Sequence, residues 1–176
     1  AAPTQQVHLD THLGHGAVRA LRNTTELAPA KIWPSFQPPR LGYQSNALEL
    51  ISNVATVDRA RAAEVAVVAV MRNEMFMLPQ FLAHYRSLGV TSFLIADNVS
   101  DDGTREYLLE QDDVALFSVD TDYNLSQYGV AWQQAMMAAF RVGRWSLVAD
   151  ADELLVWQAK QSQTLPDLLQ SPRFKG

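Results

Sequence analysis

Three carboxylates near the end of the chain, Asp150, Asp152 and Glu153, are the residues best suited to chemistry. They directly follow a mainly apolar run from Trp145 to Ala149. Such a run is typical of a buried strand, and open α/β folds bind ligands beyond the carboxyl ends of their strands. Carboxylate oxygens are the hard ligands that Mg²⁺ and Mn²⁺ prefer. The pattern therefore predicts a site for a divalent metal and a nucleotide.

Two other polar clusters also follow expected strands. The apolar run Val65–Val70 predicts a strand that leads into Arg72-Asn73-Glu74, and Thr91–Ala96 predicts a second strand, followed by the polar turn Asp97–Thr104. In a right-handed parallel sheet the carboxyl ends of the strands share one edge. We therefore expect all three clusters to converge on one ligand.

The elements between these clusters alternate in type, which predicts an α/β fold with a Rossmann-like, mostly parallel sheet flanked by helices. Proline near the start and glycine after the end are typical of a helix, and Pro79 and Gly89 bracket the first one. Ser126 is expected to cap a long helix that runs to about Val142. The other expected elements are a helix over 105–110, a strand over 114–119 and a short helix after Thr164.

Composition limits the class of protein. The chain has 176 residues, of which 48% are hydrophobic and 19% charged, and this predicts one domain with a real core. A net charge of -5 argues against a nucleic-acid partner. The absence of cysteine excludes disulfides and zinc-thiolate sites. The longest apolar run is far shorter than the roughly 20 residues of a membrane span, and no leader pattern is visible, so we expect a cytoplasmic protein.

Residues 1–63 are interpreted as an N-terminal extension of loops with short elements, and residues 64–176 as the main domain. Val7–Leu13 alternates in a way that favours a strand, and Ala47–Ala62 favours a helix. Three histidines, at positions 8, 12 and 15, would cluster on a helix, but the neighbouring glycines oppose one. We assign no metal to them.

The motifs and their order resemble those of the family 2-like glycosyltransferases of the GT-A type fold, which use nucleotide-sugar donors. The resemblance runs from about Val65 to Leu155. It rests on Arg72-Asn73-Glu74, Leu78-Pro79-Gln80-Phe81, His84-Tyr85, Leu88-Gly89-Val90, Asp97 to Thr104 and Asp150 to Glu153.

The resemblance implies a role for each polar cluster. Asp97 is expected to contact the nucleotide base, with Asn73 and Glu74 against the nucleoside. Asp150 is expected near the ribose or the metal, and Asp152 on the divalent ion. That ion, Mn²⁺ or Mg²⁺, would bridge the diphosphate oxygens and offset the charge of the leaving group.

Other residues are open to two interpretations. Glu153, Arg72 and Gln133 are candidates for contacts to the donor sugar or for support of the ligands. Arg72 could instead be an ion-pair partner of Glu74 or Asp97. Asp102 to Thr104 could be ordinary turn chemistry, and Trp132 could be core.

The chain departs from the resemblance near its end. After Glu153 the only further acid is Asp167, so we expect the catalytic base to lie outside this chain, which would then be the donor-binding part of a longer enzyme. The acceptor, a glycan, lipid or protein, and any oligomer are left open. The sequence thus predicts a glycosyltransferase that binds a nucleotide-sugar with a divalent metal, and the alternative is a non-catalytic nucleotide- or protein-binding module.

Overall fold

The computed structural model describes residues 8–9, 31–32, 48–124, 126–157, 163–172 and 174. The strands are β1 His8–Leu9, β2 Lys31–Ile32, β3 Leu48–Leu50, β4 Val65–Met71, β5 Phe93–Asp97, β6 Val114–Ser118 and β7 Trp145–Val148. The helices are α1 Val54–Ala62, α2 Leu78–Ser87, α3 Thr104–Leu109, α4 Val130–Phe140 and α5 Leu165–Leu169.

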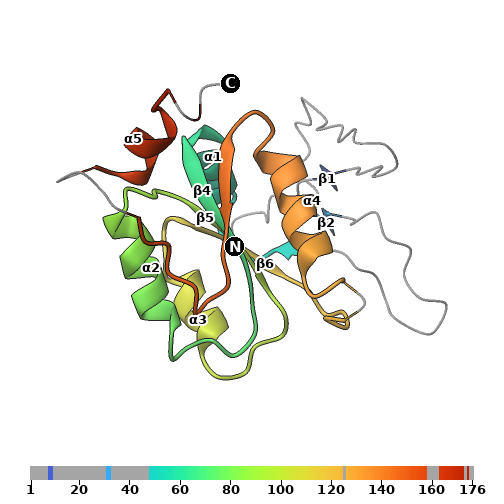
Figure 1. The fold of residues 1–176 in the computed structure, drawn as a ribbon. Helices are drawn as coiled ribbons and strands as arrows, with labels where there is room; N and C mark the ends of the chain where they lie inside the picture. Colours follow the sequence, from blue (N-terminus) through green and yellow to red (C-terminus); the bar gives the residue numbers. More distant parts are fainter. Residues whose placement is uncertain are drawn as a thin grey trace.

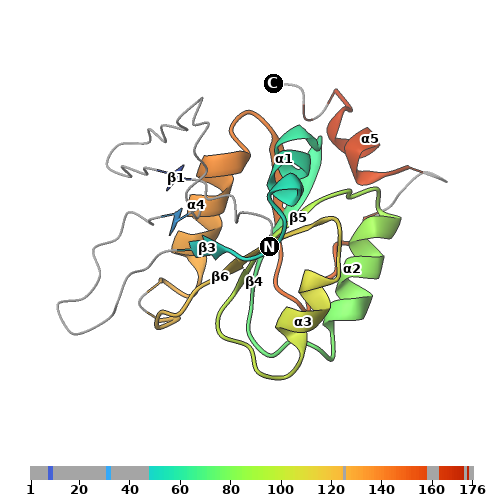
Figure 2. The same ribbon diagram turned by 180° about the vertical axis from the view of Figure 1, so that it is seen from behind.

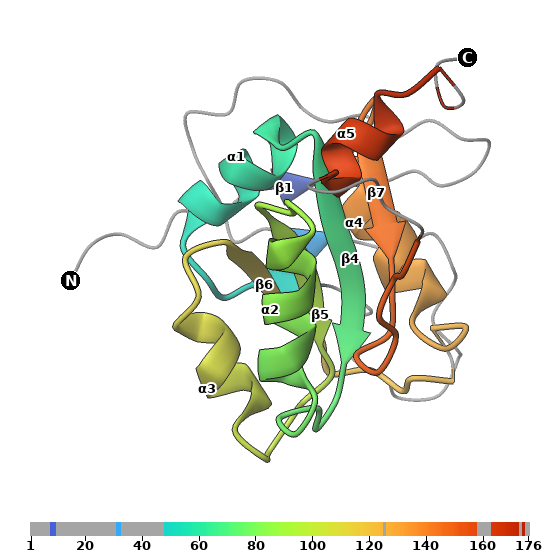
Figure 3. The ribbon, with the colours of Figure 1, turned by 60° about the vertical axis from the view of Figure 1, so that its left-hand side comes forward.

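These strands form one sheet in the order β1-β2-β3-β6-β5-β4-β7. The four strands from β4 to β7 are parallel, whereas β3 pairs antiparallel with both β6 and β2. Figure 3 shows β4 and β7 side by side with their carboxyl ends at the same edge. The expected α/β fold with a mostly parallel sheet is confirmed.

Helices cover both faces of the sheet, and Figure 1 shows α2 and α3 on one side and α4 on the other. One apolar cluster joins α4 and α1 to the sheet, and a second joins α2, α3 and α5 to the opposite face. The helix α1 comes forward in Figure 2. Burial on both faces explains why β4 reads as a continuous apolar run rather than an alternating one.

The ends of the helices follow the signals in the sequence. Gly89 follows α2 with a φ of +88°, as the expected terminating glycine should. Thr164 and Asp167 form a reciprocal capping box at the start of α5. Asp167, the acid expected near the end of the chain, therefore has a capping role in this structure.

Two elements differ from the expectation. Within Ala47–Ala62, Leu48–Leu50 is the strand β3 and the helix begins only at Val54, where the Asn53 side chain accepts from the Ala55 amide at 2.9 Å. A strand of three residues is too short to show a period, and its pairing with β6 decides its conformation.

The long helix expected from Ser126 to Val142 is also shorter than expected. The helix α4 begins at Val130 because the preceding Gly129, with a φ of +82°, is not in the conformation of a right-handed helix. The helix ends at Phe140.

The N-terminal expectations are tested only at a few positions. β1 lies within the strand expected over Val7–Leu13, and the remaining residues of that segment and the other two histidines lie outside the described residues. α1 and β3, which precede the expected division at residue 63, pack against the same core as the later elements. In the part of the chain that the structure describes, no helix is long and apolar enough to cross a membrane.

Arg141 joins three elements from the buried end of α4. Its side chain is 3% exposed and donates to the backbone carbonyls of Ala60, Ala63, Glu64 and Trp145. Burial lowers the pKa of Arg141 to about 10, with the nearby Arg144 adding to the effect. The cation therefore satisfies carbonyls that end α1 and begin β4 and β7, and it does so without an acidic partner among the described residues.

We expect Arg141→Leu to lower the free energy of unfolding by about 3 kcal/mol, because it leaves several buried carbonyls without donors. Urea unfolding followed by circular dichroism measures this. The control Arg144→Leu removes an exposed arginine three residues away and should change stability by less than about 0.5 kcal/mol. Equal effects of the two substitutions would contradict the bridging role.

Candidate functional site

A cavity of about 550 Å³ opens at the carboxyl edge of the parallel strands. It is lined by Val70, Met71, Arg72, Glu74, Met77, Asn98, Tyr123, Asp150, Ala151 and Asp152. These residues come from the ends of β4, β5, β6 and β7 or from the segments that follow them. The order of the strands reverses at β4, since β5 and β6 lie on one side of it and β7 on the other. Ligands in open α/β sheets bind at such a switch point.

The structure therefore brings together residues that lie far apart in sequence. Four of the predicted site residues, Arg72, Glu74, Asp150 and Asp152, line this one cavity. Glu153 is adjacent, and one of its carboxylate oxygens accepts from the Asp150 amide at 3.4 Å. The roles of these residues toward a ligand stay predictions.

The carboxylates of the cavity repel one another. Burial raises the pKa of Glu74, and the charges of Asp152, Asp102 and Asp150 raise it further. The pKa of Asp150 is raised by burial and by Glu153 and Asp152. Among the described residues, no lysine or arginine forms an ion pair with any of these acids. The cavity thus holds concentrated negative charge that a bound cation would offset.

A network of hydrogen bonds fastens the loop after β4 to the loop after β5. The Asn73 side chain donates to Asp101 Oδ1 at 2.8 Å and accepts from the Asp101 amide at 2.9 Å. The amide of Glu74 donates to Thr104 Oγ1, and that of Met75 donates to Asp102 Oδ2. Asn73 itself has a φ of +58°. The turn interpretation of 102–104 thus has contacts to support it, and these contacts place Glu74 beside the cavity.

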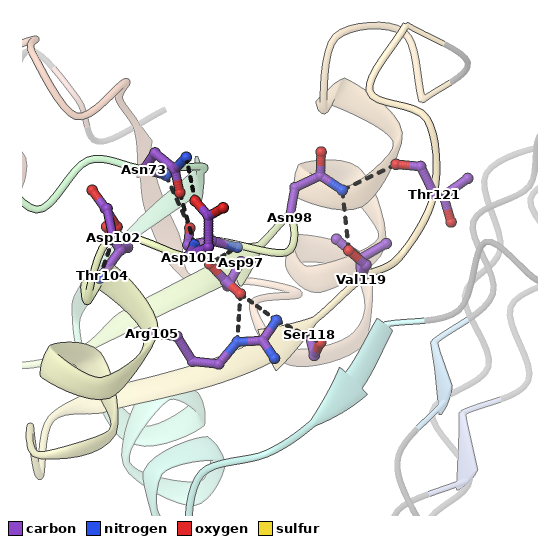
Figure 4. Close-up of polar contacts among 11 residues, drawn as sticks. Asn73, Asp97, Asn98, Asp101, Asp102, Thr104, Arg105, Ser118, Val119 and Thr121 are labelled. Atoms are coloured by element: carbon purple, nitrogen blue, oxygen red, sulfur yellow. Dashed lines mark hydrogen bonds and ion pairs between the residues drawn. The ribbon is translucent and has the colours of Figure 1, made fainter.

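Asp97 occupies a different position from the one that its expected role requires. It is fully buried and does not line the cavity, and its Oδ2 accepts from Arg105 Nε at 2.7 Å and Nη2 at 2.5 Å. Nη2 also donates to Ser118 on β6, as Figure 4 shows. The partner of Asp97 is therefore Arg105 and not Arg72, and the proposed contact with a base stays untested.

A strained turn supports one wall of the cavity. Gln127, Tyr128 and Gly129 all have φ values between +57° and +82°, in the left-handed region. Ser126 Oγ stabilises the turn by donating to the Tyr123 carbonyl at 2.6 Å and accepting from the Gly129 amide at 2.7 Å. Such strain persists where the surroundings fix it, often at ligand sites.

Tyr123 forms the aromatic part of this wall. It contacts Tyr128 edge to face, with ring centroids 6.0 Å apart. Burial and the nearby charge of Asp150 raise the pKa of the Tyr123 phenol. A Cβ on Gly129 would lie 3.1 Å from both the Tyr123 ring and Val70, so the absence of a side chain there lets the ring approach β4.

Two candidates on α4 lie away from the cavity. Gln133 is 8% exposed and is not among the lining residues. Trp132 is fully buried in the apolar cluster that joins α4 to the sheet, which confirms the core interpretation.

The lining residues that the sequence did not indicate as site residues are all uncharged. Met77 and Asn98 lie in segments whose recognisable motifs consist mainly of charged residues. Tyr123 lies in the loop after β6, where the sequence shows no motif. Their position just after expected strands is the one signal that could have found them.

The described residues were also compared with the ligand groups that proteins use to hold metal ions. In the described segments no three residues of the His, Cys, Asp and Glu types are grouped so that they could hold a metal ion. The acids at the cavity therefore do not form such a ligand group by themselves.

Comparison with known proteins found a distant relative among the glycosyltransferases. The chain is 28% identical over 125 residues to a glycosyltransferase family 92 protein of Oryza sativa subsp. japonica, an alignment that covers 66% of this chain. The chain spans about a fifth, 20%, of the length of that relative. No family model and no solved structure matches the chain. The likeness supports a distant glycosyltransferase relationship, without specifying family 2 or the GT-A type.

We expect Gly129→Ala to destabilise the protein by about 2 kcal/mol, because a left-handed alanine costs about 1 kcal/mol and the new methyl group presses on Tyr123 and Val70. Gly143→Ala is the matched control. Its φ of +73° carries the same backbone cost, but no atom lies within 4 Å of the added Cβ. Urea unfolding of both variants isolates the packing contribution, and equal losses would show that Gly129 does not hold the wall.

Proposed function

We propose that this chain binds a nucleotide-sugar together with Mn²⁺ or Mg²⁺ and serves as the donor-binding part of a glycosyltransferase. The observation that carries the proposal is the cavity at the switch point, where several carboxylates lie without an ion-pair partner among the described residues. The distant relative supports the class of enzyme.

The carboxylates fit a divalent ion shared with a diphosphate. Mg²⁺ is usually held by one or two carboxylates and completes its shell with water and substrate phosphates. Asp152 and Asp150 would supply the carboxylates, which agrees with the lack of a larger protein ligand group in the described segments. When bound, the ion would act as a Lewis acid that offsets charge on the diphosphate leaving group.

The remaining lining residues suit the rest of such a ligand. Arg72 is exposed at the cavity, and no ion pair with it occurs in the described segments, so its guanidinium is available to a phosphate or a sugar hydroxyl. Tyr123 offers an aromatic face, and Met71 and Met77 offer adaptable apolar contact. Glu74, held by the hydrogen bond from its amide to Thr104, lies close enough to the aspartates for their charges to raise its pKa.

Calorimetric titration with uridine and guanosine diphosphates, with Mn²⁺ and with a chelator, tests the proposal. We expect one of them to bind at least about tenfold more tightly with Mn²⁺, because the ion links the diphosphate to Asp152. Asp152→Asn should keep the fold and remove most of the gain. Asp58→Asn removes the same charge from an exposed site on α1 and should leave the gain unchanged.

Two results would contradict the proposal. Equal affinity with and without the ion would show that the carboxylates do not bind a shared cation, and a full Mn²⁺ gain in Asp152→Asn would move that role to another residue. Circular dichroism of each variant confirms that the comparison is made on folded protein.

A further inference from the structure

The segment that carries the candidate metal ligands lies beyond the last strand of the sheet. The pairing of β7 with β4 ends at Val148, and residues 150–155 then run beside α2, as Figure 1 shows. The segment begins with a turn in which the Glu153 amide donates to the Asp150 carbonyl at 3.0 Å. Asp150, Asp152 and Glu153 are exposed. The strand therefore fixes only the start of this segment, and something else must hold its far end.

Tyr85 on α2 contacts the far end of the turn. This residue is 1% exposed. Its hydroxyl donates to the Glu153 carbonyl at 2.9 Å and accepts from the Leu155 amide at 3.3 Å. Burial raises the pKa of the Tyr85 phenol above its ordinary value, so the hydroxyl keeps its proton and acts as a donor at neutral pH. One side chain thus joins two backbone groups that lie two residues apart.

His84, the preceding residue of α2, adds a third hydrogen bond. Its Nε2 lies 2.9 Å from the Leu155 carbonyl. A carbonyl oxygen accepts and never donates, so Nε2 must carry a hydrogen. The His84 and Tyr85 rings meet edge to face, with centroids 5.2 Å apart. Both the amide and the carbonyl of Leu155 are therefore bonded to α2, and we call these three hydrogen bonds from His84 and Tyr85 the α2 clasp.

The α2 clasp is the polar attachment of this segment. In the described part of the chain, every hydrogen bond that joins residues 150–155 to the rest of the molecule involves His84 or Tyr85. The other attachment is apolar, since Ala151, Leu154 and Leu155 pack in the cluster beneath α2. Apolar burial is non-directional and leaves the orientation of the backbone free. The direction of the carboxylates thus depends on the α2 clasp.

The acids of the turn oppose the arrangement in which they are held. After burial, the charges of Glu153 and Asp152 are the main causes that raise the pKa of Asp150. Without a fixed backbone this repulsion would move the carboxylates apart. A divalent ion such as Mg²⁺ demands a strict geometry, so ligands that have moved apart bind it less well.

We propose that Tyr85 and His84 are positioning residues for the divalent metal, because the α2 clasp holds the turn so that Asp150 and Asp152 face one ion. This proposal rests on the proposed function and adds two residues to it. Neither residue is among those that line the cavity, so both act through the backbone of the turn and not by contact with a ligand.

The first experiment removes the hydroxyl of Tyr85. Tyr85→Phe keeps the ring, whose centroid lies 4.8 Å from that of Phe81. Calorimetric titration with uridine and guanosine diphosphates, each with Mn²⁺ and with a chelator, measures the gain in affinity that the ion provides. For the tighter of the two, we expect this gain to fall at least about fivefold, while the affinity in chelator stays within about twofold. Tyr107→Phe removes a hydroxyl from α3 in the same helical layer and should change neither affinity.

The outcomes separate the proposal from the proposed function. A Mn²⁺ gain that is present in the natural protein and unchanged in Tyr85→Phe would overturn the positioning role alone. Equal losses with Mn²⁺ and with the chelator would also overturn it, because they would assign Tyr85 a general structural role. Absence of any Mn²⁺ gain in the natural protein would refute the proposed function, and the inference with it.

The second experiment uses His84 and decides the question even where Tyr85→Phe does not fold. His84 is only half-buried, so substitutions there leave the core intact. His84→Gln keeps an N–H donor near the position of Nε2, whereas His84→Leu removes it. We expect His84→Leu to lower the Mn²⁺ gain at least about threefold and His84→Gln to retain it within about twofold. Equal gains in the two variants would overturn the role of the α2 clasp.

Discussion

The reversal of strand order at β4 is the constraint on which the site depends. β5 and β6 extend the sheet on one side of β4 and β7 extends it on the other, and the cavity opens at the carboxyl ends of these strands. The covering helices and the two apolar clusters hold this arrangement. Every polar group at the cavity is positioned by the strand that it follows.

The cavity brings several carboxylates close together, although their like charges repel one another. Glu74 and Asp150 have raised pKa values because burial and neighbouring acids disfavour their charged forms. The surrounding structure keeps them close through hydrogen bonds that use other atoms, such as the Thr104 hydroxyl on the Glu74 amide. A ligand that brings positive charge would relieve this repulsion, which is the physical link between the fold and the proposed function.

The adjacent residues Asp97 and Asn98 differ in what their side chains contact, because Asp97 forms a buried ion pair with Arg105. Asp97 fixes the end of β5 to α3 and, through Arg105, to Ser118 on β6. Asn98 is thereby held where its amide can bond two carbonyls and still face the cavity. In sequence the charged residue looked like the ligand contact, but in the structure the neutral one lines the cavity.

The sequence by itself determined the α/β class, the parallel strands and the convergence of three polar clusters, because apolar runs, helix periods and strand-end positions are local signals. It missed β3, whose conformation comes from pairing with β6, and it placed the start of α4 too early at Ser126. Only the tertiary structure decided that Arg105 neutralises Asp97 and that Asn98 and Tyr123 line the cavity. These outcomes depend on which strands are neighbours. The spacing of residues in the sequence does not reveal which side chains meet across the sheet.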